Sequence, residues 1–167
     1  MLMNEVFNST VPISWTEDDR IAEGIFSVND LTFKIKLERS EYIFKDKVYT
    51  YVNVGFKRKD NEGGWTDALI GDNAFTPKIY GAIVNGVNSK IVGAPLAALV
   101  FIAQDNVEKR MKFYNRILDY VSRANFPGEI YDIGLGVGRK CSMILSKEFH
   151  NREILDDFKK YLAGLDK

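Results

Sequence analysis

The sequence is poor in the two residue types that most often carry nucleophilic or metal chemistry. Cys141 is the only cysteine and His150 the only histidine among 167 residues. A single cysteine cannot form an internal disulfide, which fits a reducing compartment. One imidazole excludes a histidine-rich metal site and any mechanism that needs two imidazoles. A Cys141–His150 nucleophile pair is conceivable, but a lone cysteine in an apolar strand is more often a small core residue.

A surplus of one charge and a long apolar run are also absent. Lys+Arg and Asp+Glu each number 23, so the formal net charge is zero. This balance disfavours general electrostatic binding of DNA or RNA, although a local basic face remains open. No apolar run approaches the roughly 20 residues of a membrane span, and the first ten residues lack the pattern of a signal peptide. We therefore expect a soluble intracellular protein without a cleaved segment.

Apolar periodicity predicts strands in the first part of the chain. The apolar content of 46% and the charged content of 28% are ordinary for one globular domain. Residues 31–38 and 48–57 alternate between apolar and polar side chains, as half-buried strands do. Shorter strands are expected at 24–28 and 65–70. Residues 16–19 are expected to form a helical turn or an acidic loop.

The centre of the chain predicts helix, buried strand and helix. Thr76 as N-cap and Pro77 at the first helical position start a helix over 77–92, and Gly86 on its apolar side indicates close packing on a sheet. Residues 99–104 form a continuous apolar run, typical of a central strand. Residues 106–124 carry one apolar stripe at helical spacing.

Two strands and a helix are expected to close the chain. The strands span 129–133 and 140–145, and Asn151 caps the last helix. Gly134, Gly136 and Gly138 imitate a glycine-rich nucleotide-binding turn, but too little chain follows to build that sheet, so a hairpin turn or bulge is the preferred interpretation. The class is α/β (α+β), with a single mixed central sheet in one domain over 1–167.

This order of elements resembles the GCN5-related N-acetyltransferase (GNAT) fold: strand meander, helix, strand, helix, strand pair and C-terminal helix. In that family a buried strand ends near an Asn, and the next helix carries a Tyr that often protonates the coenzyme A thiolate. The resemblance implies Tyr114 as catalytic acid. It also implies that Phe75, Thr76 and Asn106 border acetyl-CoA. The alternative for Tyr114 is a core tyrosine, because it lies on the apolar stripe of its helix.

The sequence departs from the family at the turn that binds the coenzyme A pyrophosphate. Residues 71–77 contain no spaced glycine pair, Asp72 adds a negative charge and Pro77 lacks an N–H donor. The chain is also similar to small uncharacterised proteins of tailed phages. Both share the run seen here as Phe101, Ala103, Arg110, Tyr114 and Arg116.

A second face of the helix over 106–124 is basic. Four cations fall within about 60° of one another on a 3.6-residue helix, namely Lys109, Lys112, Arg116 and Arg123. They predict contact with a protein or other anionic partner; a solvated face is the alternative. The run Lys57-Arg58-Lys59 could join them or simply keep a strand end soluble.

These observations predict a divergent, non-catalytic GNAT-like domain of phage origin that acts in the host cytoplasm by macromolecular binding. One alternative is an acyl-CoA-dependent N-acyltransferase, which would use acetyl-CoA. Another is a small structural or assembly protein that associates through an exposed sheet edge. The leading interpretation needs no cofactor and no metal. It includes no membrane partner and no strong nucleic-acid signal.

Overall fold

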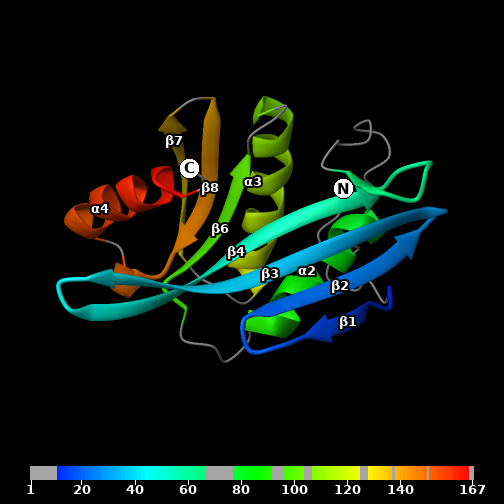
Figure 1. Cartoon of the computed structure of the whole chain (residues 1–167), viewed down its shortest axis with the longest axis horizontal. Helices are drawn as coiled ribbons and strands as arrows, with labels where there is room; N and C mark the ends of the chain where they lie inside the picture. The colour runs from blue at the N-terminus through cyan, green and yellow to red at the C-terminus, as the bar shows by residue number, and fades with distance from the viewer. Residues whose placement is uncertain are drawn as a thin grey trace. The chain divides into compact units, whose positions relative to one another are not determined.

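The structure is a computed structural model that describes residues 11–66, 77–91, 96–103, 107–124, 128–136, 138–149 and 151–165. These residues form eight strands, three α-helices and one 3₁₀ turn, a mixed α+β arrangement (Figure 1). The elements are β1 (Ser14–Glu17), β2 (Ile21–Val28), β3 (Leu31–Phe44), β4 (Lys47–Lys59), β5 (Trp65–Thr66), α2 (Pro77–Ile91), β6 (Ala98–Ala103), α3 (Val107–Ala124), β7 (Glu129–Gly136), β8 (Arg139–Leu145), η2 (Lys147–Phe149) and α4 (Arg152–Ala163).

The eight strands make one mostly antiparallel sheet in the order β1-β2-β3-β4-β6-β8-β7, with β5 paired to β4. The chain divides into two compact units. The first unit holds Met1–Glu38 and Val54–Val92, and the second holds Arg39–Asn53 and Gly93–Lys167. The boundaries fall inside β3 and β4, so each of these strands contributes to both units.

The first unit buries one face of β2, β3 and β4. The ring of Phe33 stacks between Phe26, at 5.3 Å, and Phe56, at 5.4 Å. Helix α2 packs against β2, and Gly86 on this helix approaches the sheet closely, because a Cβ there would lie 3.3 Å from Ile35 Cδ1 on β3 and 2.9 Å from Ile13 Cδ1. Lys36 on the alternate side of β3 is exposed. The predicted alternation of β3 and the predicted role of Gly86 are therefore confirmed.

Strand β1 corrects one expectation. Residues 14–17 form a strand antiparallel to β2, with Ser14 opposite Ile25 and Glu17 opposite Ala22. The expected helical turn over 16–19 is therefore wrong, and the expected acidic loop is limited to the turn at Asp18 and Asp19. The reason lies in the following turn, where Asp18 Oδ1 accepts the backbone N–H groups of Arg20 and Ile21 at 2.8 Å each. An Asp side chain that satisfies these donors closes a hairpin instead of starting a helix.

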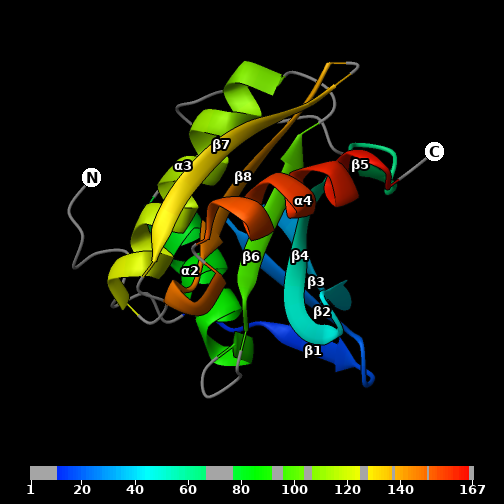
Figure 2. The same cartoon turned by 90° about the vertical axis from the view of Figure 1, so that its left-hand side faces the viewer.

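The second unit is built on β6. This strand pairs in parallel with β4 over three residue pairs, from Tyr51–Ala98 to Asn53–Val100, and antiparallel with β8 along its whole length. The side chains at 98–101 are fully buried, as the apolar run predicted. Figure 2 shows α3 and α4 on opposite faces of the strands β6, β8 and β7.

The closing elements of the second unit follow the sequence closely. Asn151 caps α4, because its side chain accepts the N–H of Glu153 at 2.8 Å. Strands β7 and β8 form an antiparallel pair whose register shifts between Gly134 and Gly136. Gly136 and Gly138 have positive φ angles of 81° and 71°, so the glycine-rich stretch makes a bulged turn, as interpreted. Within the described ranges, no helix is long and apolar enough to cross a membrane.

Candidate functional site

Tyr114 lies on the side of α3 that faces β6. Its ring stacks on Phe101 with centroids 4.8 Å apart and an interplanar angle of 29°. Only 4% of Tyr114 is exposed, and Met111 and Leu118 of the same stripe are buried beside it. A general acid has to reach its leaving group, at hydrogen-bond distance or through one water. The geometry of Tyr114 is therefore that of a packed core residue.

The three residues expected to border a cofactor, Phe75, Thr76 and Asn106, lie outside the described residues. The described helices begin just after them, α2 at Pro77 and α3 at Val107. Pro77 has no backbone N–H, so the first turn of α2 offers one donor fewer to a phosphate than another residue would give.

The four predicted cations of α3 are all exposed: Lys109, Lys112, Arg116 and Arg123. Arg110, their neighbour in sequence, is only 5% exposed and belongs to the buried side of the helix. Arg123 forms an ion pair with Asp119 one turn earlier, Nη2 to Oδ2 at 3.3 Å. This ion pair offsets the charge of Arg123, whereas Lys109, Lys112 and Arg116 precede it on the same exposed face. That the four share an exposed face is confirmed, and their partner stays a prediction.

A polar chain between α3 and the sheet was not predicted. Ser142, which is fully buried on β8, donates a hydrogen bond to Asn115 Oδ1. Asn115 Nδ2 in turn donates to Asp132 Oδ2 at 2.9 Å. A serine inside the apolar run of β8 was the available signal, since a buried hydroxyl needs a partner. Among the residues that the structure describes, no imidazole or amine is bonded to this polar chain to activate the hydroxyl, so its geometry is structural.

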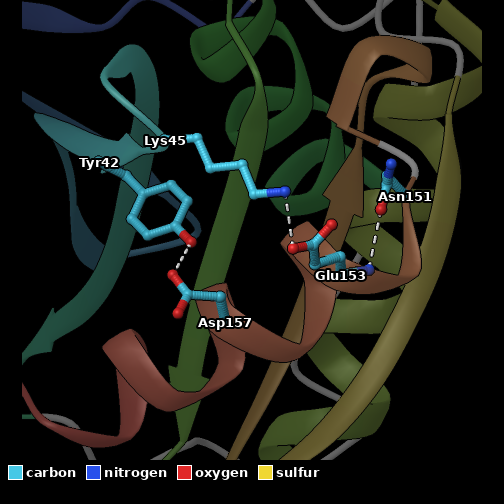
Figure 3. Close-up of polar contacts among 5 residues, drawn as sticks. All are labelled: Tyr42, Lys45, Asn151, Glu153 and Asp157. Carbon is cyan, nitrogen blue, oxygen red and sulfur yellow. Dashed lines mark hydrogen bonds and ion pairs between the residues drawn. The ribbon is translucent and has the colours of Figure 1, made fainter.

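Figure 3 shows polar contacts that join α4 to strand β3 and to the turn after it. Tyr42, 2% exposed, donates its hydroxyl proton to Asp157, and Lys45 Nζ pairs with Glu153 Oε1 at 2.8 Å. Burial and the Asp157 hydrogen bond raise the pKa of Tyr42 above its ordinary value. The phenol therefore stays protonated and serves as a donor.

Cys141 is fully buried in β8. Burial, with a smaller contribution from Asp132, raises the pKa of its thiol, so the reactive thiolate is disfavoured. His150 lies outside the described residues. The part of the chain that the structure describes contains no cluster of three or more His, Cys, Asp or Glu side chains able to hold a metal ion.

Comparison of the chain with protein-family models, with curated proteins and with solved structures gave no match.

Proposed function

We propose that this chain is a divergent, phage-encoded GNAT-like domain that works by binding another macromolecule and not by acyl transfer. The GNAT-like part is supported by the strand order β1-β2-β3-β4-β6-β8-β7, with one parallel pair, β4 and β6, among the pairs described. It is also supported by the position of α2 before β6 and α3 after it.

The observation that carries the proposal is the packing of Tyr114. In an acyltransferase of this layout, Tyr114 would protonate a leaving thiolate and its hydroxyl would border the substrate. Here the side chain is 4% exposed and stacked on Phe101, so its ring contributes to the core between α3 and β6. The proline at the first position of α2 further weakens that helix as a pyrophosphate site.

The binding surface that we propose is the exposed basic face of α3. Lys109, Lys112 and Arg116 follow one another at helical spacing on the side away from the sheet. Exposed charges of one sign attract an oppositely charged partner and accelerate its association. An acidic protein surface is the partner that this face fits.

Binding at α3 is tested with a labelled polyglutamate peptide as the acidic probe, followed by fluorescence anisotropy. Lys109→Glu/Lys112→Glu should lower its affinity about tenfold or more, and the remaining binding should depend less on salt. Lys159→Glu/Lys160→Glu on α4 is the matched control, because both lysines are exposed on a helix of the same unit. Equal losses in the two variants would show that net charge, and not this face, governs binding.

The alternative enzyme is tested separately. Tyr114 lies on the helix that follows β6, where the resemblance places the catalytic acid, and this position makes an acyl-CoA-dependent N-acyltransferase the second candidate. Calorimetric titration with coenzyme A at about millimolar concentration should show no heat of binding if the proposal holds. Acetyl transfer from acetyl-CoA that disappears in Tyr114→Phe, which keeps the ring, would overturn the proposal in favour of the enzyme.

An assembly role is supported by β7. This strand is last in the strand order, it has eight residues, and Ile130 on it is 37% exposed. A long edge strand offers backbone groups to a second chain. Light scattering at high concentration tests this candidate: a monomer counts against it, whereas an oligomer that Ile130→Lys dissociates supports it.

A further inference from the structure

The first unit presents a second basic surface, on the side of β2, β3 and β4 opposite the buried phenylalanines. Five of its side chains define what we call the lysine face: Lys34, Lys36, Lys57, Lys59 and Trp65. Lys36, Lys57 and Lys59 are exposed, whereas Lys34 and Trp65 are half-buried. The strands that carry the lysine face are blue to cyan in Figure 1.

The register of the strands brings these lysines together. A Cβ built on Gly55 would lie 3.8 Å from Lys36 Cβ, so these two positions face each other across β3 and β4. Two residues further along an antiparallel ladder, Lys57 stands opposite Lys34. On each strand the next lysine of the same face is about 7 Å away, since a strand rises about 3.4 Å per residue.

Directly opposed like charges destabilise a pair of strands. The acidic residues of this face lie toward one end, where Glu23 stands opposite Lys36 and Glu38 opposite Ile21. At the other end the Nζ atoms of Lys34 and Lys59 lie near the ring of Trp65, and Lys57 lies on the same face opposite Lys34. This concentration of positive charge favours an anionic ligand there.

Trp65 indicates which anion. It is the Cα partner of Lys59, and its ring lies 4.6 Å from Lys34 Nζ and 5.9 Å from Lys59 Nζ. An indole among lysines on a flat sheet combines a stacking surface with phosphate-binding charges. Gly55, exposed in the middle of β4, leaves room for a close approach because it has no side chain. Ile25, 41% exposed, adds apolar surface next to Lys34.

We propose that the lysine face binds single-stranded nucleic acid, with a base stacked on Trp65 and phosphates held by Lys34, Lys57 and Lys59. An unpaired base is required, because the bases of a duplex are already stacked and their faces are not accessible to an indole. The carboxylates of an acidic protein would pair with the lysines, but a carboxylate does not stack on an indole as a base does. The proposal is independent of the one made for α3, since the two surfaces share no residue.

The test measures fluorescence anisotropy of a labelled thymidine oligomer of about a dozen nucleotides. With three phosphates bound, the logarithm of affinity should fall with the logarithm of salt concentration with a slope of about −2. Lys57→Glu/Lys59→Glu should weaken binding at least about tenfold and flatten that slope. Trp65→Leu should weaken binding about tenfold and leave the slope unchanged, because stacking releases no counterion.

The control is Lys109→Glu/Lys112→Glu, which removes the proposed α3 contacts and should bind the oligomer as the parent does. Circular dichroism establishes that each variant is folded. Any of three outcomes overturns the proposal: no binding at about 50 mM salt, equal affinity for a duplex of the same length, or an unchanged affinity in Trp65→Leu. If polyglutamate displaces the labelled oligomer as effectively as unlabelled thymidine oligomer does, the lysine face is assigned to acidic proteins instead.

Discussion

The buried aromatic clusters of the two units differ in their polar contacts. In the first unit, Phe26, Phe33 and Phe56 stack on one another, and no hydroxyl is attached to any of these rings. In the second unit, the rings around Phe158 include tyrosines whose hydroxyls are paired: Tyr42 with Asp157, and Tyr51 with Tyr161 at 3.3 Å. A purely apolar core tolerates many side chains of the right volume, whereas a polar contact in a core specifies one arrangement.

The same contrast appears in the polar chain of α3. Ser142 is fully buried and bonded to Asn115, and the buried polar side chains described in the structure, Arg110 and Ser142, both belong to the second unit. The first unit carries the exposed lysine face, and the second unit combines this buried polar chain with the exposed cations of α3.

The largest expected effect is the loss of a central ring. Phe158→Ala should lower the free energy of unfolding by about 3–5 kcal/mol, because Phe158 is fully buried among Tyr42, Tyr51, Phe149 and Tyr161. Phe33→Ala, also fully buried, is the counterpart in the first unit. Denaturant unfolding gives both values, and hydrogen exchange assigns them to a unit. If each variant lowers the hydrogen-exchange protection of both units equally, the two units unfold together and do not differ in stability.

Gly128 tests a constraint that comes from the backbone and not from the side chains of the core. Gly128 precedes β7, and a Cβ there would lie 2.3 Å from the carbonyl oxygen of Leu145. Gly128→Ala should therefore force the backbone apart and destabilise the protein by about 1–3 kcal/mol. Gly134→Ala is the control on the same strand, because its Cβ would meet no atom within 4 Å. Thermal unfolding of the two variants checks this difference, and equal melting temperatures would contradict the close approach.

The fold could be predicted in outline because each unit keeps a regular pattern. The buried residues in the first part of β3 have odd numbers, 33, 35 and 37, whereas the buried Tyr42 near its end has an even number. The alternation of buried and exposed residues therefore changes phase within one strand. That change explains why a strand ending at 38 was expected where β3 continues to Phe44. Lys45 and Asp46, with φ angles of 49° and 65°, close the hairpin without the glycine that usually marks such a turn.

The lysine face was harder to predict than the cations of α3, because it depends on the register of strands. The α3 cations share a helix, so spacing alone groups them. The lysine face needs the pairing of β3 with β4 and of Lys59 with Trp65, which no local pattern contains. The polar chain was missed for the same reason, since no local pattern contains it. Ser142 and Asn115 are 27 positions apart in the sequence, and Asn115 and Asp132 are 17 positions apart.

A smaller effect is expected when the polar chain of α3 is cut. Ser142→Ala removes the donor to Asn115 Oδ1, a half-buried acceptor, which should cost about 1 kcal/mol of stability. Removing both polar groups in Ser142→Ala/Asn115→Leu should recover part of the loss, because Asn115 Oδ1 is then absent and Asp132, which loses its donor, is exposed to water. A double-mutant cycle by urea unfolding measures the coupling. Additive losses would show that the hydrogen bond contributes no coupling.

The loss of folding stability at alkaline pH is expected to arise in the second unit. Burial raises the pKa of the Cys141 thiol above its ordinary value of 9.0, so above about pH 9 the unfolded chain loses this proton while the folded chain keeps it. Stability should then fall by about 1.4 kcal/mol per pH unit for this group until the folded thiol also ionises. Cys141→Ala should flatten the fall between about pH 9 and pH 10. An unchanged slope in this variant would place the alkaline loss elsewhere.

The smallest effect concerns the acid side of the first unit. The backbone N–H groups of Ile21 and then Arg20 lower the pKa of Asp18 below 3.8, and the carboxylate is fully exposed. The stabilisation is therefore present above pH 3.8 and is lost as pH falls through the lower pKa of the folded chain. Carboxyl-carbon NMR should find a midpoint below 3.8 in the folded protein, and the amide of Ile21 should exchange faster once Asp18 is protonated. Asp18→Asn keeps an acceptor and should preserve most of the protection, whereas Asp18→Ala should remove it. A midpoint at or above 3.8 would mean that these bonds do not hold the turn between β1 and β2.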